Sequence, residues 1–164
     1  MIISELQHLL LTLVIAIFIF WRYRNWRLIP ICFLFGFFID VDHLFDYFVS
    51  YGFNFNLGCF FDVCSYVNKS EKVYVLLHGW EYVALFWLIA RWIGKRKKIK
   101  GLEWAVSLSY FGHLLLDNFS FSHHPFSYFF IYRLLNNFSL RSFDDVKYVD
   151  FQTLKYFGKP WEFK

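Results

Sequence analysis

One apolar stretch of the sequence, FGFFIDVDHLFDYF, carries four side chains that could do chemistry. Asp40, Asp42, His43 and Asp46 lie within seven positions, among Phe, Leu, Ile and Val. Carboxylate oxygens and neutral imidazole nitrogens are common ligands of zinc and related divalent metals. Asp40 and His43 share one face of a helix, whereas Asp42 points to a different face. The stretch therefore predicts a metal site, with Asp42 serving a second metal or supporting the first ligands.

Two further histidine–acid pairs occur at helical spacing later in the chain. HGWE places Glu81 three positions after His78, and HLLLD places Asp117 four positions after His113. Residues three or four apart share a helix face, so HLLLD could supply two ligands to one ion and HGWE a ligand plus a general base. Four histidines follow one another at equal intervals of 35 residues. In a bundle of similar helical hairpins, such equal spacing can place the four side chains in one layer. These histidines are His8, His43, His78 and His113.

Structural explanations remain open for several of these residues. Glu81 could be an acid favoured at a helix start by the helix dipole, and Asp46 could reach a membrane interface. His8 could lie near the membrane surface without binding anything. His123 and His124, which precede a proline, could complete a site or lie among lipid headgroups.

Composition and hydropathy predict the elements that position these side chains. The 164 residues are 58% hydrophobic and 26% aromatic, with a mean hydropathy of +0.38, whereas soluble domains are about 45–50% apolar. Crossing a membrane takes about 20 apolar residues. We therefore expect an all-α, polytopic membrane bundle of about four transmembrane helices plus a short fifth helix at 126–138. The four long segments are 6–21, 28–49, 73–93 and 102–121. The bundle would span residues 1–138, followed by a polar C-terminal tail at 139–164.

The basic residues predict the orientation of this bundle in a cell membrane. Lys and Arg concentrate in the loops at 22–27 and 94–101, and such loops face the cytoplasm in multi-pass proteins. The N-terminus is expected to be a retained helix that faces outward. With this topology, the histidines and acids of all four helices fall in the outer half of the membrane.

Energetics favour metal ions as partners of the acids. One acid at a helix centre in lipid costs about 2.5–3.5 kcal/mol, so five would cost on the order of 10 kcal/mol, as much as a typical folding stability of about 5–15 kcal/mol. The outer halves supply almost no Lys or Arg to compensate them. We predict one to three divalent ions, with zinc as first choice. The predicted ligands are Asp40, His43, His78, His113, Asp117 and His8.

Three motifs, GFFIDVDH, LHGWE and GHLLLD, resemble those of a family of membrane-bound metal-dependent hydrolases. The family is also described as LexA-binding, inner-membrane-associated hydrolases. Its members have a segment ending in P-D-x-D-H, a later histidine at a helix start and a terminal G-H-x-x-x-D. Here Ile39 stands where the family tends to have proline, and Trp80 and Glu81 follow His78 where many relatives carry Arg or Ser. The resemblance covers roughly residues 1–125.

This family is distantly similar to zinc-dependent phospholipases C and single-strand nucleases. Those helical enzymes bind a cluster of zinc ions through His, Asp and Glu, including an H-x-x-x-D pair. The resemblance therefore implies metal-binding roles for His113 and Asp117, and also for Asp40, His43 and His78. Cleavage of a phosphodiester as the reaction follows mainly from this resemblance.

The predicted function is an integral-membrane, metal-dependent hydrolase that cleaves a phosphodiester or ester of a lipid-like substrate with metal-activated water. Glu81 or Asp42 would be the general base. The expected partners are the lipid bilayer and the lipid-like substrate, and nucleic acid is not expected. The alternative is a non-catalytic divalent-metal-binding membrane protein or a metal transporter. A transporter requires polar residues along its whole path, but the inner halves of these segments are almost purely apolar.

Overall fold

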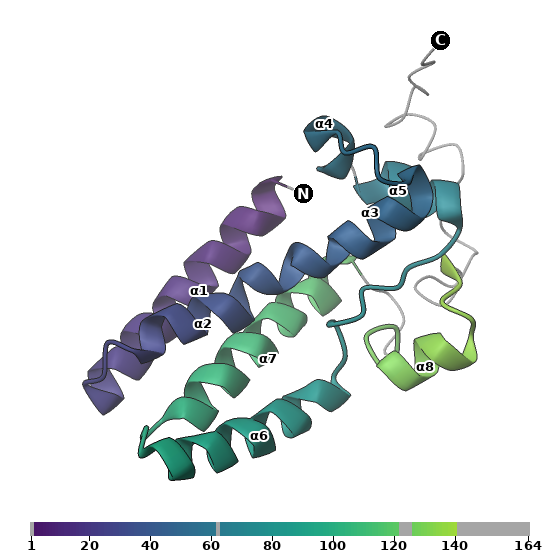
Figure 1. Ribbon diagram of the computed structural model, residues 1–164. Coiled ribbons are helices and arrows are strands. Elements are labelled where there is room, and N and C mark those ends of the chain that lie inside the picture. Colours follow the sequence, from purple (N-terminus) through teal and green to yellow (C-terminus); the bar gives the residue numbers. More distant parts are fainter. Residues whose placement is uncertain (1, 62, 122–125, 141–164) are drawn as a thin grey trace.

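The computed structural model describes residues 2–61, 63–121 and 126–140, and this part of the chain is all-helical (Figure 1). An isolated bridge joins Lys72 to Ser139. The elements in chain order are α1 (Ile2–Tyr23), α2 (Leu28–Gly36), the 3-10 helix η1 (Phe38–Asp42), α3 (His43–Tyr51), α4 (Leu57–Phe60), α5 (Val63–Ser70), α6 (Glu81–Lys97), α7 (Leu102–Phe121) and α8 (Phe130–Leu135). The prediction of an all-α fold is confirmed for these residues.

Four helices, α1, α2, α6 and α7, lie side by side, with α7 packed against the other three (Figure 1). At the end of the bundle near the turns after α1 and α6, the core is built from small and aliphatic side chains. Because residues such as Ala16, Ala90 and Ala105 leave little bulk between the helices, the backbones can approach closely. The buried members are Ala16, Ile19, Leu28, Cys32, Ala90, Leu102, Ala105 and Val106.

The opposite end of the bundle is broader and richer in tyrosine. Here α3 packs against α5, and both lie beyond the end of α2 (Figure 1). Tyr47, Tyr66 and Tyr110 are fully or almost fully buried in this second core, together with Leu114 on α7. The buried histidines and carboxylates lie at this end of the molecule, so the two ends differ sharply in polarity.

The predicted helix over 28–49 is not continuous. α2 ends at Gly36, and the stretch Phe38–Tyr51, made of η1 and α3, is bent by 49° relative to α2. Phe37, at the break, has φ −130° and ψ −47° and is not helical. The tighter 3-10 turn carries Asp40 and Asp42 and directs their carboxylates to different partners, described below.

The predicted helix over 73–93 begins later than expected, at Glu81. Residues 73–80 form an irregular segment whose backbone N–H groups bond to side chains. Asp46 accepts from Tyr74 and Val75, and Asp42 accepts from Leu77. His78 therefore lies on a loop, and the prediction that His78 and Glu81 share one face of a helix is wrong.

The expectation of four transmembrane helices is also not supported. In the described part of the chain, one helical stretch, Glu5–Tyr23, is long and apolar enough to cross a membrane, and the bent pair α2 and η1–α3 would make a second. The late start shortens α6 to 17 residues, and α7 carries Glu103, His113 and Asp117. Length and composition therefore indicate one or two spans.

The remaining predicted segments differ in length from their expected bounds. Within 126–138 the helix α8 covers only six residues, and its Arg133 is completely buried. Of the predicted tail at 139–164, residues 141–164 lie outside the described part of the chain, as do His123 and His124.

Gly36, at the end of α2, permits the close contact among α1, α2 and α7. A methyl group added there would lie 2.5 Å from Thr12 Oγ1 and 3.2 Å from Ser109 Cβ, and both neighbours are buried. The site end of α7 depends on the same contact, because the Gly36 carbonyl oxygen lies 3.2 Å from His113 Nδ1.

We expect Gly36→Ala to lower the free energy of unfolding by about 1–3 kcal/mol, the usual cost of overpacking a core. The expected sign opposes helix propensity, which favours alanine over glycine. Thermal unfolding followed by circular dichroism measures the change. Gly58→Ala on exposed α4 is the control: its methyl group would meet only the exposed side chain of Asn56, at 3.3 Å, so the effect should be small. An equal effect at both positions would contradict the packing argument.

Candidate metal centre

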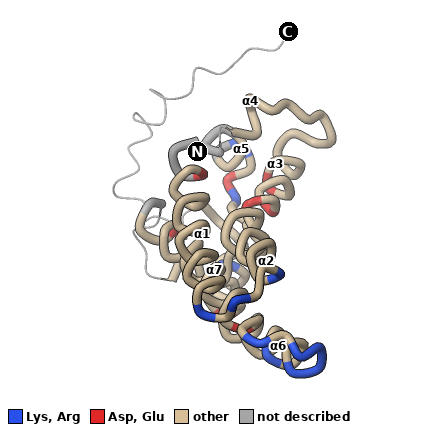
Figure 2. Tube along the Cα trace, turned by 90° about the vertical axis from the view of Figure 1, so that its left-hand side faces the viewer, with Lys and Arg blue, Asp and Glu red and all other residues tan. Residues whose placement is uncertain are grey.

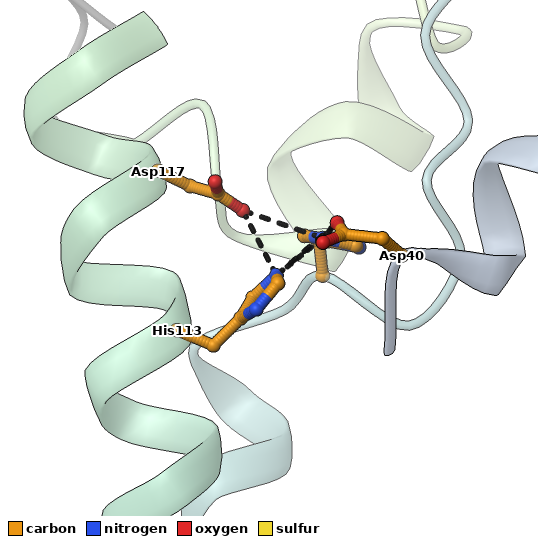
Figure 3. A group of neighbouring side chains, drawn as sticks. Asp40, His113 and Asp117 are labelled. Atoms are coloured by element: carbon orange, nitrogen blue, oxygen red, sulfur yellow. Dashed lines mark hydrogen bonds and ion pairs between the residues drawn. The ribbon is translucent and has the colours of Figure 1, made fainter. Parts of the chain in front are cut away.

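A compact group of four side chains gathers where η1, the irregular segment and α7 meet (Figure 3). Asp40 comes from η1, His78 from the segment before α6, and His113 and Asp117 from successive turns of α7. Each offers a ligand atom within 4.8 Å of those of the other three. Both histidines and Asp117 are buried, and Asp40 is partly buried.

Two nitrogens and two oxygens converge in this group. His78 Nε2 lies 3.0 Å from His113 Nε2. The Oδ1 atom of Asp40 lies 3.2 Å from His78 Nε2 and 3.3 Å from His113 Nε2, and Asp117 Oδ2 lies 3.3 and 3.2 Å from the same two nitrogens. Four imidazole and carboxylate donors are the number and type that zinc binds in proteins.

The second nitrogen of each histidine is already engaged. His78 Nδ1 lies 3.0 Å from Asp42 Oδ2, and His113 Nδ1 lies 3.2 Å from the Gly36 carbonyl oxygen. An acceptor at Nδ1 keeps the proton there and leaves the Nε2 lone pair directed into the group. Both histidines are thereby prepared as Nε2 ligands, so the residues present fit a divalent metal ion.

The carboxylates of Asp40 and Asp117 each turn their other oxygen toward His8 on α1. His8 Nε2 lies 3.2 Å from Asp117 Oδ1, and His8 Nδ1 lies 3.4 Å from Asp40 Oδ2. Glu5, His8 and Asp40 form a further group with converging ligand atoms. Because Asp40 belongs to both groups, the donors could hold more than one ion.

Glu5 was missed by the sequence analysis, although its signal was present. It precedes His8 by three positions and so shares a face of α1 with it. The same spacing drew attention to the other histidine–acid pairs. A glutamate near an N-terminus is common on helices for reasons of the dipole alone, so the sequence by itself does not separate the two roles.

His43 lies at the more accessible edge of the group. Its Nε2 lies 3.6 Å from Asp40 Oδ1, and it forms a third converging group with Asp42 and His78. Asp42 Oδ2 accepts from Leu77 N–H at 2.7 Å as well as facing His78. The other oxygen, Oδ1, is buried and has no hydrogen-bond partner among the residues that the structure describes.

The electrostatics of the centre favour a bound cation. Burial by itself would favour the neutral imidazole of His78, but the charge of Asp42 and the hydrogen bonds to Asp117 and Asp40 outweigh it. They hold the pKa of His78 well above its ordinary value. A site that attracts a proton this strongly also attracts a metal ion, which competes with protons for the same lone pairs.

Two of the acids singled out in the sequence lie outside the cluster. Asp46 is buried, and its carboxylate accepts from the N–H groups of Tyr74 and Val75. Glu81 accepts from Phe130 and Ile131 N–H, each at 3.0 Å, at the start of α8. The geometry therefore gives Glu81 a capping role and places Asp42, the other predicted base, next to the metal ligands.

Comparison with known proteins gave no match: no family model, curated protein or solved structure is similar to this chain. The resemblance to membrane-bound metal-dependent hydrolases thus remains a prediction from its motifs.

We expect the purified protein to contain at least one divalent metal ion per chain. Asp40→Asn and His113→Ala should each lose it, because each removes one of the four converging donors. Inductively coupled plasma mass spectrometry measures the content. Glu103→Gln, in the first turn of α7 and outside the groups of converging donors, is the matched control and should retain the metal. A wild-type protein without metal, and with none taken up on addition, would contradict the assignment.

Proposed function

We propose that this protein is a membrane-bound, metal-dependent hydrolase that cleaves a phosphodiester or ester of a lipid-like substrate. The observation that carries the proposal is the convergence of His78 Nε2 and His113 Nε2 with one oxygen each of Asp40 and Asp117. Zinc is the first choice of metal, since two imidazoles and two carboxylates suit it and since it has no redox chemistry.

A bound divalent ion lowers the pKa of its water to about 7 and polarises a phosphoryl or carbonyl oxygen. The chain supplies the ligands and a proton acceptor. Asp42 Oδ1 is buried next to His78 and is available to accept a proton, so we assign Asp42 as the general base. The assignment of Glu81 is set aside because both of its oxygens bind α8.

The partial exposure of the metal centre supports a catalytic metal ion rather than a purely structural one. Catalytic metal sites keep a position open for water or substrate, whereas structural sites are closed. The side chains of His43 and Asp40 are 19% and 13% exposed, but those of His78, His113 and Asp117 are at most 6% exposed. The centre is thus reached from the side of η1 and the start of α3.

The surface near this opening is apolar, which favours a lipid-like substrate. Chain neighbours of Asp40, Asp42, His43 and His78 expose large fractions of hydrophobic side chains. These neighbours are Phe38, Val41, Phe45 and Leu77. A substrate with an acyl or prenyl chain could rest on this surface while its ester or phosphate group reaches the buried donors.

The outward surface of the bundle and its charge distribution support a multi-pass location in a membrane, with α1 and the bent pair α2 and α3 as the spans. Exposed apolar side chains occur along α1 and α6, and contiguous exposed apolar surface is typical of sites that contact a membrane or a protein. Prominent examples are Leu6, Leu10, Val14 and Ile17 on α1 and Leu85, Leu88 and Trp92 on α6.

Most of the basic residues gather at one end of the molecule, at the turns after α1 and α6 (Figure 2). Exposed Trp21, Trp26 and Trp92 lie near them, as expected for a membrane–water interface. We infer that this end is cytoplasmic and that the metal centre lies toward the outer face.

Transport is less well supported than hydrolysis. A conduction path would have to continue from the metal centre toward the basic end, but the core there consists of the alanine and aliphatic cluster around Ala16, Leu28 and Ala105. An ion leaving the His and Asp donors would meet an apolar region with few alternative ligands.

With zinc or manganese supplied in excess, we expect the purified protein to hydrolyse phosphodiester substrates, such as bis(p-nitrophenyl) phosphate and a short-chain phosphatidylcholine. At a metal content equal to that of wild type, which must be checked because Asp42 also faces His78 Nδ1, Asp42→Asn should lower kcat by about 10²- to 10⁴-fold, the usual contribution of a general base. Glu103→Gln, at the opposite end of α7 from His113 and Asp117, is the control and should stay within a few-fold of wild type. Metal-loaded protein that cleaves neither these phosphodiesters nor carboxylic esters would leave the non-catalytic alternative in place.

Orientation can be measured by thiol labelling of intact cells. In a Cys59→Ser, Cys64→Ser background that keeps buried Cys32, we expect a membrane-impermeant maleimide to label Asn54→Cys, near the metal-centre end, without cell disruption. Lys97→Cys, at the basic end, should react only after the membrane is opened. Both positions are exposed, so labelling of both in intact cells would contradict the topology.

A further inference from the structure

The segment that carries His78 has an irregular and partly strained backbone. Val75 has φ 30°, which is unfavourable for any residue with a Cβ atom and especially for a β-branched one. Such conformations cost about 1–3 kcal/mol and persist only where the surroundings hold them. His78 lies three positions after Val75 and directs its Nε2 into the metal centre. The groups that hold this segment therefore also determine where the ligand atom of His78 lies.

One side of the segment is held by Asp46 on α3. Its carboxylate is almost fully buried and accepts hydrogen bonds from Tyr74 N–H at 2.6 Å and Val75 N–H at 2.9 Å. Charged acceptors make stronger hydrogen bonds than neutral ones. Asp46 therefore fixes the amide groups immediately around the strained residue.

The carbonyl groups of the same segment are held by Arg133 on α8. Its side chain is 0% exposed. Nη1 donates to the carbonyl oxygens of Tyr74 and Val75, each at 3.1 Å, and Nη2 donates to the carbonyl oxygen of His78 itself. The planar guanidinium presents its donors in a rigid fork, so it links the strained residue to the ligand residue in one geometry.

Arg133 is in turn positioned by backbone bonds between its own segment and the one it holds. Val73 N–H donates to the Phe138 carbonyl, and Trp80 N–H donates to the Tyr128 carbonyl, each at 2.9 Å. Glu81 caps α8 from the other direction. Residues 126–140 are thus attached to both ends of the irregular segment, with Arg133 between the two attachments.

We propose that Arg133 is the positioning residue for the metal ligand His78, with Asp46 holding the N–H groups of Tyr74 and Val75, two of the residues whose carbonyl groups Arg133 holds. This rests on the proposed metal-dependent function. Asp42 sets the rotation and tautomer of the ring through Nδ1, while Arg133 sets where the backbone of His78 lies. The other reading is that Arg133 only stabilises the fold, in which case its loss would lower stability and leave the metal centre unchanged.

The first test compares cobalt(II) binding by wild type, Arg133→Lys and Asp46→Asn, with affinity measured by competition against a chromophoric chelator. Lysine keeps the charge but lacks the fork, and asparagine keeps the shape but loses the charge. We expect both variants to bind cobalt about 10- to 100-fold more weakly, as is usual when groups that support ligands are changed. The visible absorption spectrum of bound cobalt should also change.

Tyr47→Phe is the matched control. The buried Tyr47 hydroxyl donates to the Asn54 carbonyl and accepts from Asn56 N–H, so its loss removes a comparable side-chain anchor from a different loop. We expect it to lower the melting temperature while cobalt affinity and spectrum remain those of wild type. Folded Arg133→Lys with wild-type affinity and spectrum would overturn the proposal.

A second measurement does not require metal binding and separates failure of this inference from failure of the proposed function. Hydrogen–deuterium exchange of metal-free protein reports protection of the amides of Tyr74, Val75 and Leu77. Arg133→Lys should increase exchange in 73–80 by at least several-fold while α1 and α7 remain protected, and Tyr47→Phe should leave 73–80 unchanged. If wild type binds no metal but Arg133→Lys loses protection over 73–80, the proposed function is wrong and the anchoring of this segment by Arg133 is supported. If Arg133→Lys keeps the protection of wild type, the proposed role of Arg133 is wrong.

Discussion

The rest of this structure depends on one constraint: the partly buried carboxylate of Asp40 and the buried carboxylate of Asp117 face the same pair of imidazole nitrogens. Asp40 and Asp117 each lie within hydrogen-bonding distance of His78 and His113, and removing charges from water is costly unless a cation compensates them. The compensating cation can be a proton or a metal ion. The engaged Nδ1 atoms of both histidines favour the metal, because they leave two Nε2 lone pairs directed at one point.

The two ends of the bundle have different roles: one packs the helices together, and the other carries the candidate metal ligands. At the basic end, small and aliphatic residues allow the helices to pack closely, and this packing stabilises α7. At the other end the same helix supplies His113 and Asp117. Gly36 joins the two regions, since it permits the approach of α1 to α2 and its carbonyl faces His113. A rigid apolar scaffold thus determines where the charged groups meet.

The acids of this chain serve different purposes despite their similar surroundings. Asp40 and Asp117 face imidazole nitrogens, Asp42 supports a ligand ring, Asp46 holds backbone amides, and Glu81 caps a helix. Together with Arg133, Asp42 and Asp46 replace the backbone hydrogen bonds that a helix over 73–80 would have made. An irregular loop at the centre is therefore compatible with burial, because its polar groups are satisfied by charged side chains.

The sequence by itself determined that the chain is helical and which histidines and acids are unusual in an apolar setting, because hydropathy, helical spacing and charge are local properties. It identified His8, Asp40, His78, His113 and Asp117 as candidates, and the fold brings them together. Only the tertiary structure decided where helices break, which acids face a metal and which hold the backbone. The break after Gly36, the loop at 73–80, the inclusion of Glu5 and the burial of Arg133 depend on contacts between residues far apart in the chain. Asp46 and Val75 are 29 positions apart, and Arg133 and Val75 are 58 apart. No local pattern records such bonds, since their energy exists only after the helices have packed.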